Sequence, residues 1–250
     1  MLYFITCMEK KLYESGAGKY FEASFKKYNS IEQPFELIVL QNHFPHYDDY
    51  NKIVQVYTYL KSKDSVSKDD NDVFLYLDIS NTLIMKSLDI SIETTFKESG
   101  EDIIFGANSS FKYIYPEAAS YYENRYKGLQ QKYLDFGFYI GYKKSIIQYF
   151  GFILNKIQYY PKPDGKISSQ RVVGYVFYQK DAKEHSSTNK ALQNLKLNLD
   201  VSNFYFYAQN ENKSIYELLL NNSFFIQFSD LHKQNQKKDY FLISKFKDLI

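Results

Sequence analysis

Short apolar runs alternate with segments of helical spacing along the first half of the chain. Runs typical of strands buried on both faces occupy residues 2–6, 35–40, 73–77 and 103–105. Between them, apolar residues recur at helical spacing over residues 18–27, 50–61 and 90–98. Further strands are predicted at residues 138–142, 196–199, 204–207 and 224–227. This alternation predicts an α/β fold in which a mixed, mostly parallel sheet is flanked by helices.

The length of 250 residues predicts a single domain over residues 1–250, because one hydrophobic core can still serve a chain of that size. Polar stretches at residues 62–71 and 161–169 are expected to be solvated loops, and a helix with one wet face is expected over 232–247. Cys7 is the only cysteine, so no intrachain disulfide can form.

Charge and hydropathy argue against several classes of partner. The net charge is +2, and 31 basic residues are interleaved with 29 acidic ones, which argues against a nucleic-acid ligand. Residues 1–7 lack the basic flank of a signal peptide, and the apolar run 146–154 is too short to cross a bilayer. We therefore expect a cytoplasmic protein without membrane contact. The 26 Tyr and 21 Phe are typical of codon usage in an AT-rich genome.

Asp78 is the first candidate for a functional residue. It directly follows the apolar run 73–77, and ligands of open α/β sheets bind beyond the carboxyl ends of the strands. A carboxylate there can hold a divalent cation against a nucleotide diphosphate, because hard cations prefer oxygen ligands. A single aspartate in this position more often only caps the turn after the strand.

Other motifs for chemistry are weak. His43, His46, Asp48 and Asp49 have metal-ligating side chains, but the two histidines lack the i, i+4 spacing of a helical zinc site, so a solvated loop is favoured. The chain has no GxGxxG and no Gly-rich phosphate loop, which disfavours dinucleotide and P-loop enzymes.

Several spaced segments, in the same order, resemble the glycosyltransferase domain of procollagen lysyl hydroxylases. They are Phe4-Ile5-Thr6, Asn51-Lys52-Ile53, the stretch 78–84 from Asp78, the stretch 103–108 followed by Pro116, the stretch 133–142, and Leu197-Asn198-Leu199-Asp200. The resemblance covers nearly the whole chain, and its most specific part is the stretch 133–142. It implies a single domain with a GT-A-like fold, a UDP-sugar donor, Mn²⁺ and a collagen-like acceptor.

The resemblance also assigns site residues, many of them changed. The metal positions correspond to Asp78, Asn81 and Gln227. The positions that bind the nucleotide sugar correspond to Thr6, Phe44, Lys52, Ser80, Asp135, Gly137 and Lys233. The catalytic positions, a run of aspartates ending in glutamine in the family, correspond to Ser168, Ser169 and Gln170.

These changes predict a degenerate site. Asn81 and Gln227 are neutral, so we expect no metal or weakly bound Mn²⁺, and serine hydroxyls cannot replace carboxylate bases near neutral pH. We therefore expect a catalytically weak or inactive protein that acts as a binding or assembly partner of a glycosyltransferase, a hydroxylase or a collagen-like protein, or that forms a homodimer. The first alternative is an active transferase of glucose or galactose to hydroxylysine, with charge supplied by Asp135, Asp164 or Asp230. The second is a structural protein with an empty cleft.

Overall fold

The computed structural model of the chain describes residues 1–14, 17–29, 34–42, 50–67, 69–79, 82–110, 115–160, 168–182, 190–209 and 222–228. Within these residues, six strands form one sheet in the order β2-β1-β3-β6-β5-β7, and three short strands form another in the order β4-β9-β8. The strands of the larger sheet are β1 (Leu2–Glu9), β2 (Glu36–Asn42), β3 (Val73–Leu77), β5 (Ile103–Asn108), β6 (Tyr133–Tyr142) and β7 (Leu197–Leu199). Those of the smaller sheet are β4 (Thr82–Ile84), β8 (Phe206–Gln209) and β9 (Phe225–Phe228).

The larger sheet is mixed and mostly parallel. The pairs β1–β2, β1–β3 and β5–β7 are parallel, whereas β6 is antiparallel to both β3 and β5. Only β6 therefore runs against the other strands of this sheet. This confirms the predicted fold class, and it places the start of β6 at the edge where β3 and β5 end.

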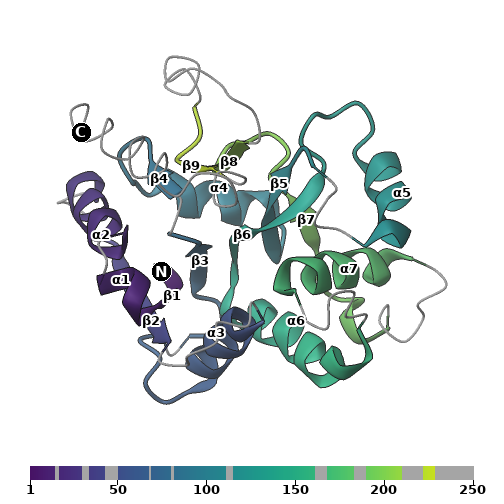
Figure 1. Cartoon of the computed structure of the whole chain (residues 1–250), viewed down its shortest axis with the longest axis horizontal. Helices are drawn as coiled ribbons and strands as arrows, with labels where there is room; N and C mark the ends of the chain where they lie inside the picture. The colour runs from purple at the N-terminus through teal and green to yellow at the C-terminus, as the bar shows by residue number, and fades with distance from the viewer. Residues whose placement is uncertain are drawn as a thin grey trace.

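Each face of the larger sheet is covered by a different set of elements (Figure 1). One face packs against α3 (Asn51–Lys61), α5 (Pro116–Arg125), α6 (Lys143–Lys156) and α7 (Ser169–Asp181). The other face packs against α2 (Ala17–Tyr28), α4 (Ser91–Ser99) and the smaller sheet. Successive side chains of β1 point to opposite faces of the sheet. Tyr3 and Ile5 pack in the core under α3, α5, α6 and α7, whereas Leu2 and Phe4 pack in the core under α2, α4 and the smaller sheet.

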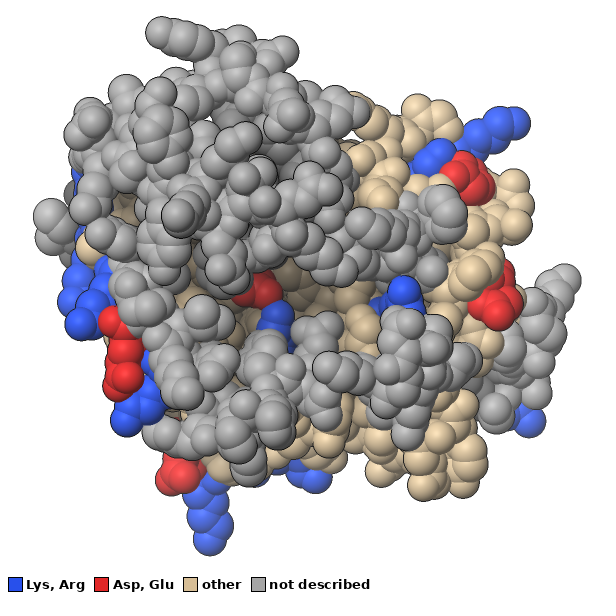
Figure 2. Space-filling view, in the orientation of Figure 1, with Lys and Arg blue, Asp and Glu red and all other residues tan. Residues whose placement is uncertain are grey.

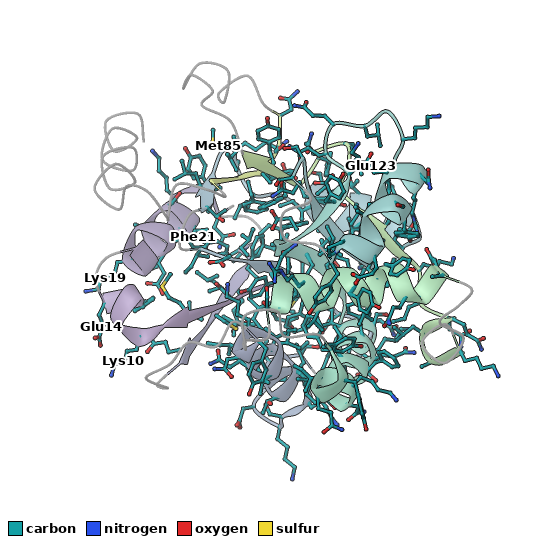
Figure 3. The ribbon with its side chains drawn as sticks, turned by 45° about the vertical axis from the view of Figure 1, so that its right-hand side comes forward. Lys10, Glu14, Lys19, Phe21, Met85 and Glu123 are labelled. Carbon is teal, nitrogen blue, oxygen red and sulfur yellow. The ribbon has the colours of Figure 1, made fainter. Side chains whose placement is uncertain are left out.

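Local sequence explains where several helices begin, end and face. In α2, Phe21 is buried and points inward while Lys19 points outward (Figure 3). The short α1 (Lys10–Glu14) pairs Lys10 with Glu14 at 3.7 Å, one helical turn apart. Helix α4 ends at Gly100, whose φ of 68° is left-handed and suits glycine. Helix α5 begins at Pro116, where a missing backbone N–H costs nothing.

The structure also differs from the sequence predictions in its loops. In the predicted solvated loop 62–71, Ser65 and Ser67 are buried, and the Lys143 ammonium donates a hydrogen bond to the Ser67 carbonyl. Ser169 is helical, so the predicted loop 161–169 ends before it. Residues 161–167 and the predicted closing helix 232–247 lie outside the described residues. In the described part of the chain, no helix is both long and apolar enough for a membrane span.

Candidate functional site

Polar side chains from several elements meet where β3 ends. Asp78 follows the fully buried strand β3, as the sequence predicts. Thr6 lies on the neighbouring strand β1 and is fully buried, and its hydroxyl donates to the Leu77 carbonyl at 2.7 Å. Because Leu77 pairs with Phe138 on the antiparallel β6, the first residues of β6 extend this edge. The site therefore has the position expected for ligand binding in an α/β sheet.

Lys52 and Asp78 form an ion pair at the centre of this edge. The Lys52 Nζ lies 2.5 Å from the Asp78 Oδ2, and the two side chains keep 14% and 20% of their surface exposed. Lys52 comes from the first turn of α3, which packs on β1 and α6. The docking of α3 thus joins a cation and a carboxylate that are 26 residues apart in sequence. Over the described part of the face in Figure 2, basic and acidic side chains are interspersed.

Asp135 is a second carboxylate at this edge, but it is buried and each of its oxygens accepts a hydrogen bond. Its Oδ1 accepts a hydrogen bond from the Gly137 backbone N–H at 2.8 Å, and its Oδ2 accepts one from the Asn108 amide at 2.9 Å. Burial raises the pKa of Asp135, although both hydrogen bonds oppose the shift. The negative charge of Asp78 raises this pKa further, and Lys52 lowers it. Asp135 therefore stabilises the turn of its own strand, and its two donors fix its orientation.

Strand β6 carries an irregularity beside Asp78. The register of β5 on β6 moves from Phe105 opposite Tyr139 to Gly106 opposite Asp135. The backbone of β6 in this interval is held by side chains and by the Asp78 loop. The Asp78 N–H donates to the Gly137 carbonyl at 2.8 Å. This hydrogen bond ties the backbone of Asp78 to the bulged part of β6, the strand that also carries Asp135.

Gln170 holds the same bulge from the helical side. Its side-chain oxygen accepts a hydrogen bond from the Phe136 N–H at 2.6 Å, and its amide nitrogen donates to the Leu134 carbonyl at 2.5 Å. In this way the Gln170 amide satisfies two backbone groups of β6 in the irregular part of the strand. Ser168 is the N-cap of α7 and accepts a long hydrogen bond from the Arg171 N–H at 3.5 Å, and Ser169 is buried. Among the contacts of the described residues, Gln170 is the candidate catalytic residue whose side chain forms hydrogen bonds with β6.

Strand pairing also carries Gln227 toward the site. Gln227 of β9 is opposite Thr82 of β4, and the Thr82 hydroxyl donates to the Asp78 carbonyl at 2.5 Å. The side chain of Gln227 is not among the described parts. Also outside the described residues are Phe44, Ser80, Asn81, Asp164, Asp230, Lys233 and the group His43, His46, Asp48 and Asp49. Their predicted roles stay predictions.

Two further residues belong to the site although sequence reasoning assigned them no role there. Asn108 ends β5 and orients Asp135, and its position as a polar residue after an apolar strand was the available signal. Cys7 lies on β1 with its thiol 3.9 Å from the Lys52 carbonyl, and burial raises its pKa. A buried protonated thiol packs as an apolar group, so the contribution of Cys7 is to pack against the backbone of Lys52.

Comparison with solved structures shows the fold class. The chain is similar to the crystal structure of a glycosyltransferase involved in the glycosylation of the major capsid of PBCV-1, with a TM-score of 0.56 and 8% identity over 97% of this chain and 98% of that one. It is also similar to apo mouse xyloside xylosyltransferase 1, with a TM-score of 0.48 and 7% identity over 92% of this chain and 98% of that one. No protein-family model and no curated protein matches the sequence. The likeness to the first of these structures shows that the chain has a GT-A-like fold.

Proposed function

We propose that this chain is a glycosyltransferase-like protein that binds a nucleotide sugar beside Asp78 and transfers the sugar weakly or not at all. The fold and the polar edge beyond β3 support binding. The observation that carries the loss of transfer is that serines stand where the family has aspartates: Ser168 caps α7, Ser169 is buried, and neither hydroxyl can act as a base near neutral pH. Gln170, which matches the family, braces the backbone of β6.

The finer proposal concerns donor and partners. The resemblance to procollagen lysyl hydroxylases, strongest over residues 133–142, favours UDP-glucose or UDP-galactose as the bound donor. It also favours a collagen-like protein, a hydroxylase or an active glycosyltransferase as the partner in an assembly, or a second copy of this chain. In such an assembly the protein contributes shape and nucleotide binding, and the partner contributes catalysis.

An active transferase is the second candidate, and Asp135 is the observation that favours it. This carboxylate lies at the same edge as Asp78 and within its electrostatic reach. To act as a base it would have to do so from the orientation that the Asn108 and Gly137 donors fix. Nucleotide binding needs no base, so the binding function is the better supported of the two.

The proposal predicts that UDP and UDP-sugars raise the melting temperature of the protein. A ligand at 100 times its dissociation constant stabilises the native state by about 2.7 kcal/mol, which is roughly 5–11 °C for a chain of this size. Thermal-shift titrations with UDP, UDP-glucose and ADP measure the effect, with ADP as the control for base selectivity. Release of UDP from UDP-glucose should stay at background. Robust Mn²⁺-dependent turnover would promote the active transferase instead.

A further inference from the structure

The contact between Lys52 and Asp78 bears on which cation this site uses. A divalent ion bound to the Asp78 Oδ2 would have to lie where the Lys52 ammonium now lies, 2.5 Å from that oxygen. Two cations cannot share one carboxylate oxygen at such a distance without strong repulsion. At this oxygen, either the ammonium leaves or the divalent ion stays out.

The other donors of the site do not favour a divalent ion. Asp135 is buried, and each of its oxygens accepts a hydrogen bond, from Asn108 and from Gly137, which fixes the orientation of the carboxylate within its own strand. Across the described residues, no group of three His, Cys, Asp or Glu could hold a metal. Asn81 and Gln227 are neutral, and Mg²⁺ and Mn²⁺ prefer anionic oxygen ligands. The residues therefore do not fit the metal that the fold family implies.

Lys52 also occupies a position where a cation is unfavourable for its own helix. It is the second residue of α3, and the first turn of this helix has no acidic residue. A helix N-terminus is already electropositive, so a lysine there raises the local positive potential. Asp78 offsets this repulsion in the free protein. The same positive end of the helix, together with the ammonium, is suited to an anion such as a phosphate.

We propose that the Lys52 ammonium, and not a divalent cation, supplies the positive charge that meets the diphosphate of the bound nucleotide, with Asp78 as the counter-ion that positions it. This inference rests on the proposed nucleotide binding and specifies its chemistry. Binding is then independent of Mn²⁺, weakened by salt, and dependent on the charge at position 52. No bond is made or broken in this role.

The test is calorimetric titration of UDP into the full chain, in EDTA and in Mn²⁺. We expect the same dissociation constant in both, a loss of at least about tenfold in Lys52→Met, and partial recovery in Lys52→Arg, the scale expected for one charge-assisted hydrogen bond. The matched control is Lys61→Met, which removes the same charge from the exposed last residue of α3 and should leave binding unchanged. Thermal melts check that each variant is folded.

Asp78→Asn separates a counter-ion from a metal ligand. Removing a negative charge beside a diphosphate should leave UDP binding equal or tighter in EDTA and in Mn²⁺, whereas loss of a metal ligand would abolish the Mn²⁺-dependent binding of UDP. UDP binding that requires Mn²⁺, or that Lys52→Met leaves intact, overturns the role of Lys52 and spares the proposed function. Absence of UDP binding with and without Mn²⁺ overturns the proposed function itself.

Discussion

Asp135 shows how a single buried carboxylate links the site to stability. Its raised pKa means that, between the ordinary carboxyl value of about 4 and the folded value, the native state keeps a proton that the unfolded state has lost. Stability therefore falls as pH rises through this interval. Asp135→Asn removes that dependence, so the free energy of unfolding of the variant relative to wild type should increase with pH from about 4 upward. Urea denaturation at a series of pH values measures the difference.

Asp181 provides a control, because its pKa is shifted in the direction opposite to that of Asp135. Although burial acts against it, its pKa is lowered by hydrogen bonds from Tyr121 and Lys180. Its contribution to stability is present above the ordinary carboxyl pKa and is lost as pH falls through the lowered value. Asp181→Asn should therefore lose stability relative to wild type as pH rises toward about 4. The same slope for both variants would contradict the assignment of burial as the cause at Asp135.

At the scale of elements, the joint between α7 and β6 depends on Gln170. Gln170→Ala leaves the Phe136 N–H and the Leu134 carbonyl without their partner, so it should lower the free energy of unfolding by roughly 1–3 kcal/mol. Ser168→Ala removes only a 3.5 Å capping bond on the same helix and should cost at most about 1 kcal/mol. Urea denaturation compares the two variants. An equal effect of both would mean that Gln170 does not brace the strand.

The strands of the larger sheet were the most predictable elements. Both faces of this sheet are covered by other elements, so its strands are buried on both sides and read as continuous apolar runs. The run 73–77 matches β3 residue for residue, and the other predicted strands overlap observed ones. Strand β6 starts earlier than the predicted residue 138, because Asp135 breaks the apolar run and is tolerated only through Asn108 and Gly137. Helices α1, α5, α6 and α7 were not predicted, and neither was the three-residue β4. In α6 and α7, closely spaced aromatic residues obscure the helical spacing.

The candidate site was predictable only in part. Asp78 at the end of a central strand follows from the apolar run before it, and the structure confirms that position. Its pairing with Lys52 depends on how α3 docks against the sheet, which no local pattern encodes. Gln170 was singled out through a resemblance, yet its hydrogen bonds to β6 depend on a bulge that spacing alone does not reveal. Tertiary packing therefore decides the chemistry of each of these residues.

At the scale of the whole molecule, two cores share one sheet. Phe105 belongs to the core under α6 and α7, and Phe138 belongs to the core under the smaller sheet, and both are fully buried. Because alternate residues of the same strands serve both cores, loss of either core removes packing from the strands that support the other. We therefore expect one cooperative unfolding transition for the sheet and its layers.

This expectation can be tested on either face. Phe105→Leu and Phe138→Leu each weaken one core, by roughly 0.5–3 kcal/mol for a single core substitution, and each should move the whole transition to lower temperature. Calorimetric and van't Hoff enthalpies should agree in both variants. Because the chain has 26 Tyr and no Trp, tyrosine fluorescence reports on both cores at once, and its transition should coincide with that of far-UV circular dichroism. A second transition that only one of the two variants shifts would mean that the two faces of the sheet unfold separately and would contradict the expected single transition.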